Sequence, residues 1–241
     1  AQGAYRAASG SDVLRRASRA FLTDYNRLRP HAPLSLVVFS TAARHLSRLV
    51  RILQQESGGH ALLLSSGSVG RRSLTRLSVF IAGHKKLIEV EMRPGYTSAL
   101  WREELKEAMH SAGVLGAPVT LMFTDSAHFS DSVVDDISHL LNTAEVPGLY
   151  TPEERALLLE NLRPVAAALG KVTAQAPETR SERLAQLASS SAGMGAYLRE
   201  LFAERVRRNL HVVLCCEAGS KLLRRRLQVF PTIALCTTSI W

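Results

Sequence analysis

The chain has 241 residues, of which 46% are hydrophobic, so it can bury a substantial core in one large domain. Lysine and arginine outnumber aspartate and glutamate by 30 to 21, for a formal net charge of +9. No apolar stretch approaches the roughly 18 residues of a membrane-spanning helix, and the three cysteines and scattered histidines match no metal or disulfide framework.

These features set limits on the kind of protein. Cysteines without a disulfide framework suit a reducing compartment. The arginines are spread along helical segments, with no aromatic interleaving and no nucleic-acid reading motif, so solvated helix faces are expected and neither nucleic acid nor a membrane is an expected partner. The chain starts at Ala1 with neither a methionine nor a secretory signal, which indicates a piece of a longer protein.

The apolar pattern predicts helices that alternate with short buried strands. Helices are expected over residues 11–29, 36–55 (after a short apolar lead), 73–83, 98–113, 132–142, 151–169, 196–209 and 220–227. Strands are expected over 60–64, 86–92, 118–123, 210–216 and 232–237. Residues 172–195 are rich in Ser, Ala and Gly and predict a mobile excursion. This alternation predicts an α/β fold with a mostly parallel sheet covered on both faces.

A loop of small residues joins the first predicted strand to the helix expected at 73–83. It follows the outline of G-x-x-x-x-G-K-[ST], whose backbone N–H groups and lysine hold nucleotide phosphates. Ser65 stands at the first glycine and Arg71 at the lysine, while Ser73 is taken as the hydroxyl that would contact Mg²⁺. A planar guanidinium substitutes poorly for a compact ammonium group. The candidate phosphate-binding residues are Ser65, Gly67, Gly70, Arg71, Arg72 and Ser73.

Asp125 directly follows the third predicted strand, where a nucleotide hydrolase holds its Mg²⁺-binding aspartate. If Asp125 is the metal-side carboxylate, Ser126 stands where a water-activating glutamate is needed. If Asp125 is instead the activating residue, Thr124 stands at the metal-side position. Neither alignment supplies the usual Asp–Glu pair, and a role for Asp125 as a helix or turn cap stays open.

Four stretches together resemble the dynein heavy chain family: "LLNTAEVPGLYTPEE", "SLTRLSVFIAG", "YTSALWREELKEAMHSAGVLGAPVTLMFTD" and "ERVRRNLHVVLC". The likeness is to the fourth AAA+ module of the motor ring, and it covers the chain from about Tyr25 to Trp241. The Thr124–Asp125 pair is similar to axonemal members. The altered loop indicates a divergent member of the family.

The resemblance implies a P-loop NTPase-like AAA+ large subdomain, a five-stranded parallel sheet with nucleotide lying between adjacent modules. Residues 1–33 would be a helical lead-in from the preceding module, and 34–241 the α/β core with the insertion at about 172–195. By the same likeness Asp125 is the Walker B-like residue and, with Ser73, a Mg²⁺ ligand. Glu217 falls at the sensor position, and Cys236 at the place of a trans-acting arginine near the end of the fifth strand.

Arg224, Arg225 and Arg226 lie upstream of that place. They are interpreted either as trans-acting arginines that contact a neighbouring module's nucleotide or as a solvated basic helix.

Departures at the lysine, the Asp–Glu pair, the sensor and the trans-arginine place predict weak or no ATP hydrolysis, because phosphoryl transfer depends on positioning and electrostatics. Bound ATP or ADP with Mg²⁺, no nucleotide, and a working ATPase module all stay open as alternatives. The implied partners are adjacent AAA+ modules of the same chain and, through the parent chain, dynein light and intermediate chains and microtubules. The implied location is the cytoplasm and cytoskeleton, in the axoneme of a cilium or flagellum.

Overall fold

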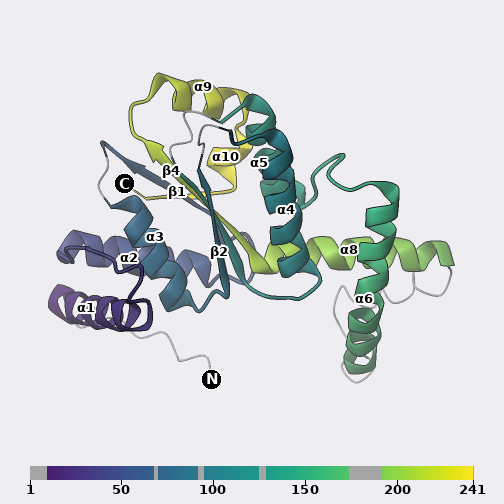
Figure 1. The fold of residues 1–241 in the computed structure, drawn as a ribbon, viewed down its shortest axis with the longest axis horizontal. Coiled ribbons are helices and arrows are strands. Elements are labelled where there is room, and N and C mark those ends of the chain that lie inside the picture. Colours follow the sequence, from purple (N-terminus) through teal and green to yellow (C-terminus); the bar gives the residue numbers. More distant parts are fainter. Residues whose placement is uncertain (1–9, 68–69, 92–94, 125–128, 174–190, 241) are drawn as a thin grey trace.

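The computed structural model describes residues 10–67, 70–91, 95–124, 129–173 and 191–240. These residues form a five-stranded sheet in the order β2-β3-β4-β1-β5, in which every neighbouring pair is parallel (Figure 1). The strands are β1 (Ala61–Ser65), β2 (Lys86–Glu91), β3 (Val119–Thr124), β4 (Leu210–Glu217) and β5 (Thr238–Ile240). The predicted α/β fold with a five-stranded parallel sheet is confirmed.

Helices cover both faces of this sheet (Figure 1). On one face lie α2 (Ser40–Leu53) and α3 (Arg71–Ala82), with α1 (Ser11–Leu28) packed on them. On the other face lie α4 (Ser98–Gly113) and α5 (Asp131–Thr143). The chain continues through α6 (Pro152–Thr173) and α8 (Ser191–Asn209) to β4, and then through α9 (Lys221–Val229) and α10 (Thr232–Leu235) to β5.

The two faces account for the continuous apolar runs in the central strands. In β3, Leu121 and Phe123 pack toward α4 and α5, whereas Met122 packs with the residues of α2 and α3. All six residues of β3 are buried, because a strand covered on both faces has no solvent side. These strands are therefore recognised from the sequence by length and apolarity rather than by alternation.

The C-terminal strand lies later than predicted. The prediction of a strand over 232–237 is wrong, because α10 occupies Thr232–Leu235 and β5 begins only at Thr238, which pairs with Ala61 of β1. Pro231 precedes α10 with φ −62°, a value already suited to a helix start. Cys236 consequently follows α10 and precedes β5, so its predicted place near the end of the fifth strand is also wrong.

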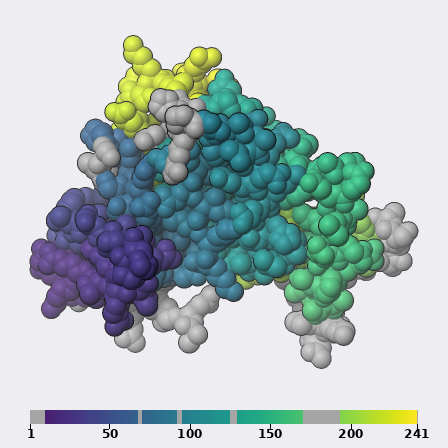
Figure 2. Space-filling model, viewed as in Figure 1, coloured from purple at the N-terminus to yellow at the C-terminus, as the bar shows by residue number. Residues whose placement is uncertain are grey.

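The predicted excursion at 172–195 lies mostly outside the described residues. At its two ends the prediction is wrong, because residues 172–173 belong to α6 and residues 191–195 belong to α8. Both helices extend away from the sheet on the side opposite α1 (Figure 1), and the region of α6 forms a projection in the space-filling view (Figure 2).

Side chains of α8 hold the C-terminal ends of α4 and α5. Arg205 donates to the carbonyl oxygen of Gly113 and to that of the next residue at 3.1 Å, and Asn209 donates to the carbonyl oxygen of Ala112 at 3.0 Å. Arg207 donates to the carbonyl oxygen of the last residue of α5 at 2.9 Å. The last carbonyl groups of a helix lack partners within it and carry partial negative charge, which explains why "ERVRRN" is rich in donors.

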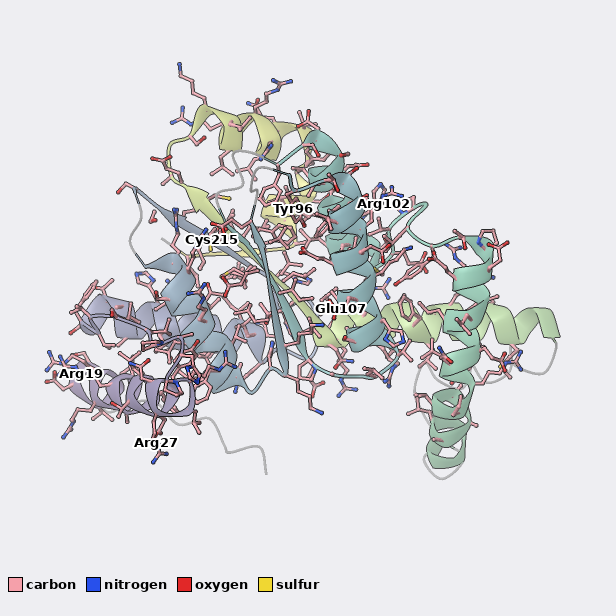
Figure 3. The ribbon with its side chains drawn as sticks, in the orientation of Figure 1. Arg19, Arg27, Tyr96, Arg102, Glu107 and Cys215 are labelled. Carbon is pink, nitrogen blue, oxygen red and sulfur yellow. The ribbon has the colours of Figure 1, made fainter. Side chains whose placement is uncertain are left out.

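Part of the positive charge is solvated, as predicted. Arg19 and Arg27 are exposed and point outward from α1 (Figure 3). Among the described residues no helix has both the length and the apolarity to cross a membrane.

Three histidines, of which His60 and His211 are buried, lie at the amino-terminal edge of the sheet, opposite to the predicted phosphate loop. The Nε2 of His84 donates to the carbonyl oxygen of Leu53 at 2.9 Å, so its Nδ1 accepts from the Thr120 hydroxyl at 2.7 Å in the neutral ring. The Nδ1 of His211 donates to the carbonyl oxygen of Gly59 at 2.9 Å. The two rings lie 4.7 Å apart between centroids.

His60 completes this histidine cluster (His60, His84 and His211). Its Nδ1 accepts from the backbone N–H of Val212 at 3.1 Å, a bond that a doubly protonated ring cannot accept. Burial, and secondarily the charge of a protonated His211, lowers the pKa of His60 and that of His84 to about 4, and burial also lowers the pKa of His211. The cluster is therefore neutral at pH 7.

Candidate functional site

The candidate phosphate loop lies between the end of β1 and the start of α3. Gly67 and Gly70 have φ of 74° and 72°, in the left-handed region that glycine enters without strain, and Gly70 is the N-cap of α3. Residues 68–69 lie outside the described residues. The predicted strand–loop–helix context is thus confirmed, and the first N–H groups of α3 point toward the carboxyl edge of the sheet.

Arg71, at the lysine position, is bound to the protein's own backbone. Its Nη1 donates to the carbonyl oxygen of Cys216, the residue before the end of β4, and to that of Ser65 at 3.4 Å. The guanidinium group therefore bridges the carboxyl ends of β1 and β4. The Ser65 hydroxyl donates to the carbonyl oxygen of Gly67 at 3.2 Å, inside the loop.

Arg72 occupies the position that the phosphate-loop pattern gives to a hydroxyl residue. The hydroxyl in G-x-x-x-x-G-K-[ST] follows the basic residue directly, so the assignment of this role to Ser73 is one residue too late. In the structure Arg72, not Ser73, reaches the end of β3, where its Nη2 donates to the Thr124 hydroxyl at 3.0 Å. The same nitrogen is ion-paired with Glu91 at the end of β2.

Asp125 lies outside the described residues, so its predicted role as the Walker B-like residue and Mg²⁺ ligand stays a prediction. Thr124, just before it, is the last residue of β3 and is 3% exposed. Glu217, at the sensor position, is exposed and pairs with Ser65 in the β1–β4 register. Its carboxylate group therefore belongs to the same edge of the sheet as the loop, at a place where negative charge would repel a phosphate.

The three consecutive arginines of α9 do not share one environment. Arg224 and Arg225 are exposed, which fits either interpretation given to them. Arg226 is 7% exposed and its Nη2 donates to the carbonyl oxygen of Phe129, so it is neither a solvated side chain nor one that can reach a neighbouring module. Burial lowers the pKa of the Arg226 guanidinium from its ordinary value.

The acceptors that hold Arg71 and Arg72 were not predicted from the sequence. Glu91 and the Thr124 hydroxyl become neighbours of Arg72 only because β2 and β3 pair in register, Glu91 opposite Thr124. The available signal was opposite charge on one face of each element. Arg72 and Arg76 lie four residues apart on the helix, and Glu89 and Glu91 lie two residues apart on the strand. Elsewhere in the described part of the chain, no group of three or more His, Cys, Asp or Glu residues is placed to hold a metal ion.

The usual Mg²⁺-bound nucleotide fits this arrangement poorly. Mg²⁺ requires a nearly octahedral set of oxygen ligands at about 2.0–2.1 Å. At the described part of the loop, a guanidinium group stands at the position of the hydroxyl ligand and already binds the Thr124 hydroxyl and the Glu91 carboxylate.

Comparison with known proteins agrees with this fold and loop. Residues 34–241 match the family described as P-loop containing dynein motor region D4. Over 221 residues the chain is 32% identical to dynein axonemal heavy chain 1 and 33% identical to dynein axonemal heavy chain 6, both of Homo sapiens, with 92% of this chain and 5% of each relative covered.

A further relative comes from Chlamydomonas reinhardtii. Over 220 residues the chain is 34% identical to the dynein-1-beta heavy chain of the flagellar inner arm I1 complex, with 91% of this chain and 4% of the relative covered. The chain thus spans only a small part of the length of these relatives. The resemblance seen in the sequence is confirmed: the chain belongs to the dynein heavy chain family, as its P-loop containing motor region D4.

Proposed function

We propose that this chain is a ring module of a dynein-like heavy chain that supports or regulates the ring with weak or no ATP hydrolysis of its own. The main support for this proposal is that the Arg71 guanidinium binds the carbonyl oxygens of Ser65 and Cys216. In a working loop the basic residue at this position reaches the β- and γ-phosphates. Rate enhancement in phosphoryl transfer comes from positioning such charges, so a cation held on backbone oxygens contributes little to it.

The wider setting follows from the relatives. The names of the similar proteins are those of axonemal and flagellar dynein heavy chains. We therefore propose that the parent chain acts in a microtubule-based complex of the axoneme of a cilium or flagellum. Adjacent AAA+ modules of the same chain would be the direct partners of residues 34–241, with residues 1–33 as a lead-in from the preceding module. Light and intermediate chains and microtubules would be bound through the rest of the parent chain.

A second candidate is a working ATP-binding and hydrolysing module. The left-handed conformations of Gly67 and Gly70 favour it, because they retain the backbone turn of a phosphate loop. In that case Arg71 would leave its carbonyl acceptors on binding nucleotide, and Asp125 would hold Mg²⁺ through water.

Photolabelling of the full heavy chain with 8-azido-ATP separates the two candidates. One sample carries the radioactive label on the α-phosphate and a second on the γ-phosphate, and both are irradiated after a period that allows turnover. Peptides from residues 34–241 are then counted. We expect either no label or equal retention of both labels. Loss of the γ-label with retention of the α-label on these peptides in the wild type, but not in Asp125→Asn, would show hydrolysis at this module and refute the proposal.

A further inference from the structure

Two arginines on one face of α3 meet two glutamates on one face of the edge strand β2. Arg76 pairs with Glu89 through two parallel bonds, Nε to Oε1 and Nη2 to Oε2, each 2.6 Å. Arg72, one turn earlier, pairs with Glu91 through Nη2 alone. The Arg76 pair has the fork geometry that fixes a helix to a strand. A second bidentate pair would be enough to anchor α3 to β2. The single bond from Arg72 to Glu91 therefore indicates a role for Arg72 besides anchoring.

Arg72 lies at the carboxyl edge of the sheet, where β3 ends. Its Nη2 is shared between the Glu91 carboxylate and the Thr124 hydroxyl, which is buried. Within the described residues its Nε and Nη1 donate to no acceptor, and the side chain is 40% exposed. The guanidinium therefore has protein oxygens on one side and unused donors on the other.

We infer that the Arg72 guanidinium is a resident cation that takes the place of Mg²⁺, so that any phosphate group bound at this loop is bound without a divalent metal. The inference rests on the proposed function, since it concerns the same loop. A planar N–H fork suits phosphate oxygens, and its fixed charge supplies part of the neutralisation that a metal otherwise gives. Its repulsion of a second cation disfavours Mg²⁺ beside it.

Metal-directed cleavage of the full heavy chain tests the inference. Fe²⁺ replaces Mg²⁺ in the presence of ADP or ATP, and ascorbate with peroxide then cuts the backbone close to the bound metal. We expect no cuts near the ends of β1 and β3 in the wild type. In Arg72→Ser, which restores the hydroxyl of the pattern and removes the charge, we expect nucleotide-dependent cuts there. Arg72→Gln, which keeps a donor for Glu91 and Thr124, is a second variant should Arg72→Ser fail to fold.

Arg76→Ser is the matched control, because it removes the same charge and one α3–β2 ion pair but leaves Arg72 in place. It should remain uncut. Cuts in the wild type would overturn the inference, and so would uncut Arg72→Ser and Arg72→Gln, because the guanidinium would then not be what keeps the metal away. Cuts in the wild type without loss of the γ-label would defeat this inference alone, whereas cuts with loss of the γ-label would defeat the proposed function as well.

Discussion

The histidine cluster predicts that the chain loses stability between pH 7 and pH 5. In the folded state the pKa of His60 and that of His84 are about 4, whereas an unfolded chain has the ordinary value of 6.5. Between these values the unfolded state binds more protons than the folded state, so the free energy of unfolding falls as the pH falls. The loss begins near pH 6.5 and is complete near pH 4.

The size of the loss follows from the same values. For one histidine with pKa 6.5 unfolded and about 4 folded, lowering the pH from 7 to 5 removes about 2 kcal/mol. His60 and His84 together then account for about 4 kcal/mol. This is a large share of the 5–15 kcal/mol that is typical of a domain. Thr120, Leu53 and the backbone of Val212 supply the bonds that hold the neutral rings.

Urea denaturation at pH 7, 6 and 5, followed by the fluorescence of the buried Trp101, measures this loss. His84→Gln should lower stability at pH 7 because it breaks the bonds to Leu53 and Thr120, and it should also reduce the change between pH 7 and pH 5 by about 2 kcal/mol. His31→Gln, at an exposed position, should leave that change as it is. A wild-type change below about 1 kcal/mol, or an unaltered pH dependence in His84→Gln, would show that the cluster does not control the stability in this pH range.

Three further variants test other contacts. Arg205→Ala should lower the free energy of unfolding by about 2–4 kcal/mol, because two carbonyl groups at the end of α4 lose a charged donor. Arg208→Ala, at an exposed position, should lower it by less than about 0.5 kcal/mol. Equal losses in a urea titration would contradict the capping role of Arg205. Gly59→Ala should lower the free energy of unfolding by about 3 kcal/mol or more, since its Cβ would lie 2.3 Å from a carbonyl oxygen of α2. Gly58→Ala should lower it by only about 1 kcal/mol, because its Cβ would meet no atom within 4 Å. Glu217→Gln should raise the photolabelling of the module by 8-azido-ATP about two- to five-fold, because it removes a carboxylate beside the loop. Reduced labelling would show that this carboxylate does not repel the phosphate groups.

The sheet and its helices were predictable because their signals are local. The strands that become β1, β3 and β4 are short apolar runs bounded by helices, and Gly83 ends α3 in the left-handed conformation that favours glycine. The segment at 232–237 was not predictable by these means, since a short apolar run gives the same signal as a helical turn or a strand. Tertiary packing determines where the strand forms, because within the described residues it is 238–240 that pair with this edge of β1.

The loop was predictable in outline but not in its contacts. A glycine before a basic residue, between a strand and a helix, is visible in the sequence. That Arg71 lies on the ends of β1 and β4, and that Arg72 meets Glu91 and Thr124, depends on strand order and register. Burial of Arg226 was likewise hidden, because a run of three arginines gives no sign that one side chain turns inward.

A cryo-EM map of the full heavy chain frozen during ATP turnover would show directly which groups Arg71 and Arg72 bind. We predict that Arg72 remains bound to Glu91 and Thr124, and that Arg71 remains bound to the carbonyl oxygens of Ser65 and Cys216. We also predict that no metal density lies between the loop and β3. A diphosphate with a coordinated metal at that place, with Arg72 displaced, would contradict these predictions.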